Sequence, residues 1–129
     1  MNEINEIVKS EQNIAITIMQ KIDELVDTFI NSQDVKESSK STYRRTLKQY
    51  FSWIYKNGYS LNEITRQHVL EYKNELLNKG KSSLTAGSYI TVVRKFYEWT
   101  ESNKIYPNVA KGVKSPTRIQ AFRKRPLSV

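Results

Sequence analysis

Cysteine is absent from the 129 residues, and histidine occurs once, at His68. Without cysteine the chain has no disulfide and no thiolate-bound metal, and a single imidazole cannot build a metal site of histidines. This composition is typical of a protein kept in a reducing compartment. We therefore expect a cytoplasmic protein that uses no metal and no other cofactor.

Long apolar runs are also missing. No stretch approaches the roughly 20 apolar residues that cross a bilayer, and the opening MNEINEIVKSEQN is polar and acidic, unlike a charged leader followed by a hydrophobic segment. We expect neither a membrane-spanning segment nor a membrane partner. The length supports one domain that buries roughly two thirds of its unfolded surface.

Acidic residues become scarce after residue 37. Residues 1–37 contain three lysines and eight acidic residues, a net charge of −5, whereas residues 38–129 contain 18 basic and five acidic residues, a net charge of +13. With a pI near 9.7, this asymmetry makes a polyanion the leading partner of residues 38–129. An anionic membrane surface would favour exposed bulky apolar residues, but here the apolar stripes are needed for a core.

Apolar residues recur at helical spacing in four stretches, so the sequence predicts an all-α domain. The first helix is expected over residues 11–32 and has an acidic polar face. The second begins at a serine cap near residue 38 and ends near Asn57. The third starts at Ser60 or Thr65 and ends before Gly80, and the fourth covers residues 82–104.

The fourth predicted helix has two distinct faces. Its apolar stripe consists of Ala86, Tyr89, Ile90, Val93, Phe96 and Tyr97. The opposite face consists of Ser88, Thr91, Arg94 and Lys95, with Gly87 beside them. Cations and small hydroxyls without steric bulk suit a phosphate backbone or the floor of a DNA groove, although a solvated helix face is the alternative for any isolated pair of basic residues.

The second predicted helix repeats this arrangement. Its inward stripe consists of Tyr43, Leu47, Tyr50, Phe51 and Ile54, and its opposite face of Ser41, Arg45, Lys48, Gln49, Ser52 and Lys56. We expect the apolar sides of the two helices to pack together and their basic sides to share one surface. Arg44 flanks the buried stripe, so it is expected to extend along it or to pair with an acid.

The sequence after residue 104 predicts irregular structure. Its three prolines, Pro107, Pro116 and Pro126, exclude a long regular element. The last residues contain Arg118, Arg123, Lys124 and Arg125 and no acid, so residues 115–129 are expected to form a basic linker that faces DNA. A plain soluble terminus is the alternative.

Four stretches follow one another in a characteristic order. A hydroxyl at Ser39 precedes YRRTL, which is followed by YFSWIYKNG; EIT opens the third predicted helix; SSLTAGSYITVVRKFYEW forms the fourth; and IYPNVAKGVKSP comes next. In order and spacing, these stretches of residues 25–129 resemble the N-terminal core-binding domain of tyrosine recombinases, the SAM-like domain of phage and transposon integrases. The chain departs from that pattern in having PNVA where many members have a reversed NPA.

The resemblance implies a four-helix domain that forms half of a C-shaped clamp around duplex DNA, with the second and fourth helices across the major groove. Residues 1–10 would be a flexible terminus, 11–114 the domain, and 115–129 the linker to a catalytic domain outside this sequence. Neighbouring recombinase protomers would contact residues 11–32. The candidate DNA contacts are Ser41, Thr42, Arg45, Lys48, Thr85, Ser88, Thr91, Arg94 and Lys95, together with Arg123, Lys124 and Arg125 of the linker.

The catalytic residues of that family are not recognisable here. Its chemistry needs a nucleophilic tyrosine with arginines, a lysine and histidines that stabilise the charged transition state. The single histidine lies in RQHVLEY, without the family's histidine, two spacers and arginine, and is expected to be an ordinary first-turn helix residue. Five of the eight tyrosines lie on inward stripes, so we expect the fragment not to be an enzyme and its parent to be a recombinase.

Two alternatives remain from the sequence. The first is a helical protein-interaction domain that docks through its acidic first helix, with incidental basic faces. The second is a complete small enzyme, which the lack of any paired acid, base and nucleophile disfavours. Trp53 and Trp99 could stack on bases, but tryptophan at the edge of a helical stripe is more often a packing residue.

Overall fold

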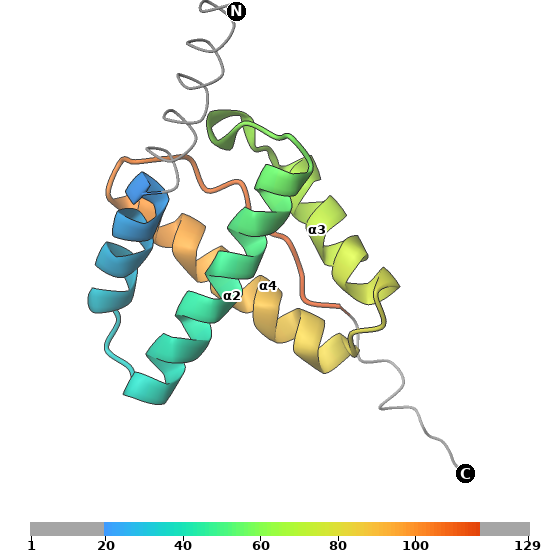
Figure 1. Cartoon of the computed structure of the whole chain (residues 1–129), viewed down its shortest axis with the longest axis horizontal. Coiled ribbons are helices and arrows are strands. Elements are labelled where there is room, and N and C mark those ends of the chain that lie inside the picture. Colours follow the sequence, from blue (N-terminus) through green and yellow to red (C-terminus); the bar gives the residue numbers. More distant parts are fainter. Residues whose placement is uncertain (1–19, 117–129) are drawn as a thin grey trace, which may run out of the picture. The chain divides into compact units, whose positions relative to one another are not determined.

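The structure, a computed structural model, describes residues 20–116 (Figure 1). The predicted flexible terminus 1–10, the helical residues predicted before residue 20, and the linker from residue 117 on, with Arg123, Lys124 and Arg125, lie outside the described residues. The described part consists of helices and connecting segments without a strand, which confirms the all-α prediction.

The helices agree closely with the sequence pattern. Residues 20–31 are helical, α2 covers Glu37–Lys56, α3 covers Arg66–Asn78 and α4 covers Ser83–Ser102, with a short 3-10 helix, η1, at Leu61–Glu63. Each predicted helix is thus present in the described part, and η1 is the one element that the pattern did not predict.

Local signals in the sequence explain the helix ends. Ser82 is the N-cap of α4, where its hydroxyl oxygen accepts a hydrogen bond from the Thr85 amide at 3.1 Å. Thr65 is the N-cap of α3, and its amide donates to His68 Nδ1 at 2.9 Å. His68 is therefore a first-turn residue as expected, with a capping role that the sequence did not indicate. Gly80, at a φ of +87°, turns the chain after α3 in a conformation that side chains rarely adopt.

The chain divides into two compact units, Met1–Arg44 and Arg45–Val129, and the boundary falls within α2. In the described part of the first unit, Val26, Phe29 and Ile30 on the helix of residues 20–31 are buried. The ring of Phe29 stacks on that of Tyr43 at a centroid distance of 6.3 Å. These contacts join the first helix to the beginning of α2.

Tyr50 is the centre of the core in the second unit. Its ring lies 5.0 Å from that of Tyr72 on α3 and 6.0 Å from that of Tyr97 on α4, both in edge-to-face geometry, and its hydroxyl lies 2.8 Å from the Tyr97 hydroxyl. Such aromatic pairs are worth about 0.5–1.5 kcal/mol each beyond their buried area. Apolar side chains of all three helices complete this core: Leu47, Ile54, Val69, Leu76, Ala86, Ile90, Val93 and Phe96.

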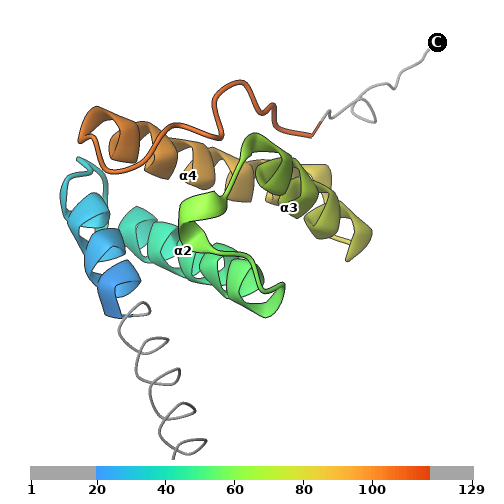
Figure 2. The ribbon, with the colours of Figure 1, turned by 90° about the horizontal axis from the view of Figure 1, so that it is seen from above.

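The tyrosine cluster fixes the arrangement of the helices in the second unit. From Arg45 onward α2 crosses α4, and the two helices lie in separate layers with α3 beside them (Figures 1 and 2). The segment after α4 returns along α4 toward α3 and buries Ala110 and Val113 (Figure 2). Tyr50, Tyr72 and Tyr97 are buried as predicted, whereas Tyr43 and Tyr89 are only half-buried.

Candidate nucleic-acid interface

One side of α4 is polar, basic and exposed. Ser88, Thr91 and Lys95 follow one another at spacings of three and four residues, and Arg94 lies beside them; all four are exposed. Ala86, Ile90 and Tyr97, on the other side of the same helix, are buried. The predicted division of this helix into a core side and a free polar side is therefore present.

The hydroxyl groups on this side of α4 already donate within the helix. Ser88 donates to the Leu84 carbonyl at 3.1 Å, and Thr91 donates to the Gly87 carbonyl at 2.9 Å. A hydroxyl has one proton, so these side chains must rotate before they can donate to a phosphate, although their oxygens can still accept. Thr85 differs, because its hydroxyl accepts from Ser82 at 3.1 Å and keeps its own proton available.

The candidate cations on α2 and α4 form no ion pair with an acid of the described residues. The described residues form three ion pairs, which are Lys40 with Glu37, Arg44 with Asp27, and Lys79 with Glu75. The four cations predicted to face DNA take part in none of these pairs, and all four are exposed: Arg45, Lys48, Arg94 and Lys95. Their charges therefore remain available to an external anion.

A groove of about 300 Å³ lies between α4 and the segment that follows it. Its α4 wall consists of Thr91, Arg94, Lys95 and Glu98, and the facing wall of Asn108, Ala110, Lys111 and Gly112. The fold thus adds Lys111 to the cations of α4. Helical periodicity gives no signal for Lys111, because this lysine lies in an irregular segment that contains proline.

Hydrogen bonds to three parts of the second unit fix the segment that forms the facing wall. The Tyr106 hydroxyl donates to the Ile64 carbonyl at 2.7 Å, and the Asn108 amide donates to the Glu101 carboxylate at 3.0 Å. Farther along, the Lys73 ammonium donates to the carbonyl of residue 114 at 3.0 Å. The wall is therefore held to α3 and α4 as part of the fold.

Gly87 departs from the sequence interpretation. Periodicity predicts a place beside the exposed small residues of the fourth helix. Gly87 is instead buried, and a Cβ atom built on it would lie 3.5 Å from the Ser115 Cβ and 3.8 Å from Pro116. The segment after α4 covers this position. Helical periodicity alone could not show this, since the covering residues come from an irregular stretch that follows the helix.

The candidate residues of α2 belong to both units. Arg45 and Lys48 are exposed in the second unit. Ser41 and Thr42 are exposed in the first unit, where the Thr42 hydroxyl donates to the Ser38 carbonyl at 3.1 Å. Like Ser88 and Thr91 on α4, Thr42 therefore uses its proton within its own helix.

The structure does not turn the middle of both basic faces toward one surface. Lys48 precedes Tyr50 by two residues and Lys95 precedes Tyr97 by two residues, and two residues correspond to about 200° around a helix. Because the two tyrosine hydroxyls meet between the helices, both lysines leave their helices on the sides turned away from this meeting point. The expectation of a single common surface is therefore not met at these two positions.

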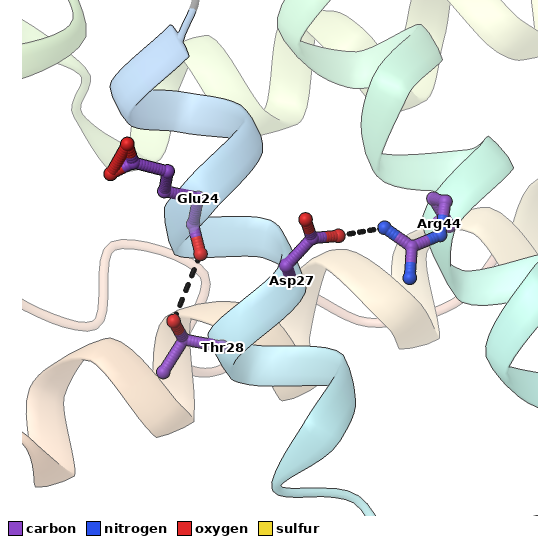
Figure 3. A network of polar contacts seen from close by, with 4 residues as sticks. All are labelled: Glu24, Asp27, Thr28 and Arg44. Atoms are coloured by element: carbon purple, nitrogen blue, oxygen red, sulfur yellow. Dashed lines mark hydrogen bonds and ion pairs between the residues drawn. The ribbon is translucent and has the colours of Figure 1, made fainter.

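Arg44 is engaged within the first unit. Its guanidinium pairs with the Asp27 carboxylate on the helix of residues 20–31, as Figure 3 shows. In the same view Thr28, the residue after Asp27, donates its hydroxyl to the Glu24 carbonyl at 2.9 Å. The pairing of Arg44 with an acid, expected from its place beside the buried stripe, is confirmed, and Asp23 and Glu24 remain as exposed acids on this helix.

Burial affects the ionisation of the tyrosine cluster. Removal from water raises the pKa of Tyr50, Tyr72 and Tyr97, because burial disfavours the phenolate. These hydroxyls are core groups, as the inward stripes predicted for Tyr50, Tyr72 and Tyr97. Trp53 is also a packing residue, with its ring 5.2 Å from that of Tyr72.

Within residues 20–116, no three histidine or acidic side chains lie close enough together to hold a metal ion. None of the helices described combines the length and the apolarity needed to cross a bilayer.

Comparison with known protein families identifies the family of this chain. Residues 22–104 match the model of the phage integrase N-terminal SAM-like domain, a stretch that begins in the first helix and ends just after α4. No curated protein and no solved structure matches the chain.

Proposed function

Because the chain belongs to the family of phage integrase N-terminal SAM-like domains, we propose that it binds duplex DNA for a site-specific tyrosine recombinase. The domain of this family is the non-catalytic N-terminal part of an integrase. In the proposal, the exposed basic sides of α2 and α4 hold the DNA during integration or recombination. Strand exchange is assigned to a catalytic domain of the same parent chain, acting in the cytoplasm.

The observation that supports this proposal best is the state of the candidate cations. Arg45, Lys48, Arg94 and Lys95 are exposed and form no ion pair with another described residue. Neutralisation of phosphates by such cations releases condensed counterions, which is the main sequence-independent source of affinity for DNA. Phosphate contacts would therefore dominate binding and fix the position of the domain on the duplex.

The small side chains have a second role in the proposal. Ser88 and Thr91 donate their protons within the helix. Their main role would come from their small size, which lets α4 approach the DNA closely. The hydroxyl of Thr85 has a proton to offer to a phosphate or a base edge. Sequence preference of the isolated chain is accordingly expected to be modest.

Lys48 and Lys95 point in opposed directions, which affects where each helix would contact the duplex. The two faces would engage different parts of the duplex, and we place the stronger contact on α4, where the groove adds Lys111 to Arg94 and Lys95. The face of α2 would supply the second, weaker contact.

Paired substitutions test the proposal. We expect both R94A/K95A and R45A/K48A to bind a short labelled duplex more weakly than the parent chain does. The loss of affinity should be larger for R94A/K95A. Both variants remove two charges from exposed positions, so their net charges are equal. Fluorescence anisotropy at several salt concentrations gives the affinities, and parent binding that neither variant changes would contradict the proposal.

The acidic first helix suggests where a protein partner would bind. Asp23 and Glu24 are exposed, whereas Asp27 is engaged with Arg44. We propose that this helix contacts a neighbouring recombinase protomer. If the chain instead is a protein-interaction domain without affinity for DNA, the duplex titration will show no binding by the parent chain.

A further inference from the structure

We infer that the groove beside α4 holds a single phosphate group of the DNA backbone, with Lys111 as a binding residue. The inference rests on the proposed function and deepens it, because it adds the segment after α4 to the DNA-binding surface. It assigns to Lys111 the same role as to the two cations on the facing helix.

The charges of the groove favour an anion. Arg94, Lys95 and Lys111 line it, and Glu98 is the one acid among the lining residues. The formal charge of the lining is therefore +2. A phosphodiester brings a single negative charge, so one bound phosphate leaves the site cationic and able to attract the rest of the backbone.

The side chain of Asn108 adds a neutral donor to the cations of the groove. The Ala110 amide donates to the Asn108 side-chain oxygen at 3.2 Å, which leaves the NH₂ group of Asn108 as its donor end. Together with the cations, this group supplies the charge-assisted and neutral hydrogen bonds that a phosphate oxygen accepts.

The groove is formed before any ligand binds. The segment that carries Lys111 is tied to the second unit on both sides of this residue, by Tyr106 and Asn108 before it and by Gly112 after it. At Gly112 the chain has a φ of +78°, and the carbonyl of this residue accepts from Arg66 at 3.4 Å. A wall fixed in this way loses little conformational entropy when a phosphate binds.

A free phosphate ion offers the same chemistry as a backbone phosphate, so the experiment uses both probes on the full chain. The first arm titrates a short labelled duplex at several salt concentrations. We expect K111A to weaken binding about 10-fold, the loss of a charge-assisted hydrogen bond, and to reduce the magnitude of the log affinity against log salt slope by about one. K21A removes the same charge from the acidic first helix, and we expect it to change affinity less than about 2-fold.

Substitution of Glu98, the acid in the groove, should change the duplex affinity in the direction opposite to K111A. We expect E98Q to tighten duplex binding, and to do so by more than E63Q, which removes the same charge from exposed η1. If only the net charge of the chain mattered, E98Q and E63Q would change the duplex affinity equally. A merely structural role of the groove would weaken binding in E98Q or leave it unchanged.

The second arm titrates inorganic phosphate and follows the backbone amides of Lys95 and Lys111 by NMR. Phosphate-dependent shifts of both amides, absent in K111A, are expected. Equal duplex affinities of K111A and K21A would overturn the inference, and phosphate shifts in that case would mark a site for a free anion only. If the parent chain does not bind the duplex at all, the proposed function itself fails, so the two failures are distinguishable.

Discussion

Three buried tyrosines show how strongly a single hydroxyl group can affect the stability of this core. The hydroxyls of Tyr50 and Tyr97 bond to each other at 2.8 Å, whereas the buried Tyr72 hydroxyl has no hydrogen-bond partner within residues 20–116. A buried polar group without a partner costs about 1–3 kcal/mol, and a paired one contributes about 1 kcal/mol. Removal of a hydroxyl is therefore expected to have different effects on stability at Tyr97 and at Tyr72.

We predict that Y97F destabilises the chain by about 1–3 kcal/mol, because it leaves the Tyr50 hydroxyl buried without its partner. Y72F is expected to leave the free energy of unfolding unchanged or to raise it by about 1 kcal/mol. Both variants remove one oxygen from a tyrosine of the same cluster, so each is the control of the other. Denaturant midpoints give the difference, and equal destabilisation by both would contradict this account.

Alkaline pH should destabilise the fold. Burial raises the pKa of Tyr50, Tyr72 and Tyr97 above the ordinary value of 10.0. Above pH 10 the unfolded chain therefore loses these protons first, and stability that is fully present below pH 10 is lost as the pH rises. Each such tyrosine contributes a slope of up to about 1.4 kcal/mol per pH unit.

Y72F should accordingly show a shallower loss of stability between pH 10 and pH 12 than the parent chain. Urea midpoints across this range measure the slopes. Identical slopes for the two proteins would show that Tyr72 ionises equally well in the folded and the unfolded state.

At the scale of elements, the sequence predicted regular structure well and irregular structure poorly. The helices over α2, α3 and α4 follow from apolar periodicity and from caps such as Ser82 and Gly80, which act within a few residues. The path of the chain after α4 depends on hydrogen bonds to partners distant in sequence, such as that from Tyr106 to Ile64. No local pattern encodes these partners, which is why the groove and the place of Lys111 in its wall do not follow from the sequence.

The candidate site was predicted only in part, because helical periodicity is a local signal. Exposure of Arg45, Lys48, Arg94 and Lys95 follows from helical periodicity and is confirmed. Burial of Gly87 and the opposed directions of Lys48 and Lys95 depend on how elements pack in three dimensions. Periodicity assigns each residue to a side of its own helix but cannot place that side against another element.

For the whole molecule, the distribution of charge is the feature that supports the proposed binding of DNA. Residues 1–37 have a net charge of −5, and residues 38–129 one of +13. If about six phosphates are neutralised, the log affinity should fall with log salt at a slope near −5. A polyanion should therefore be bound by the basic part of the chain and avoided by the acidic helix that precedes it.

The most direct test of this claim is an NMR titration of the full chain with a short DNA duplex. We expect the shifted backbone amides to belong to the exposed sides of α2 and α4 and to residues 108–112, and the shifts to reverse when salt is added. Shifts confined to residues 11–32, or no shifts at low salt, would contradict the assignment of DNA binding to this domain.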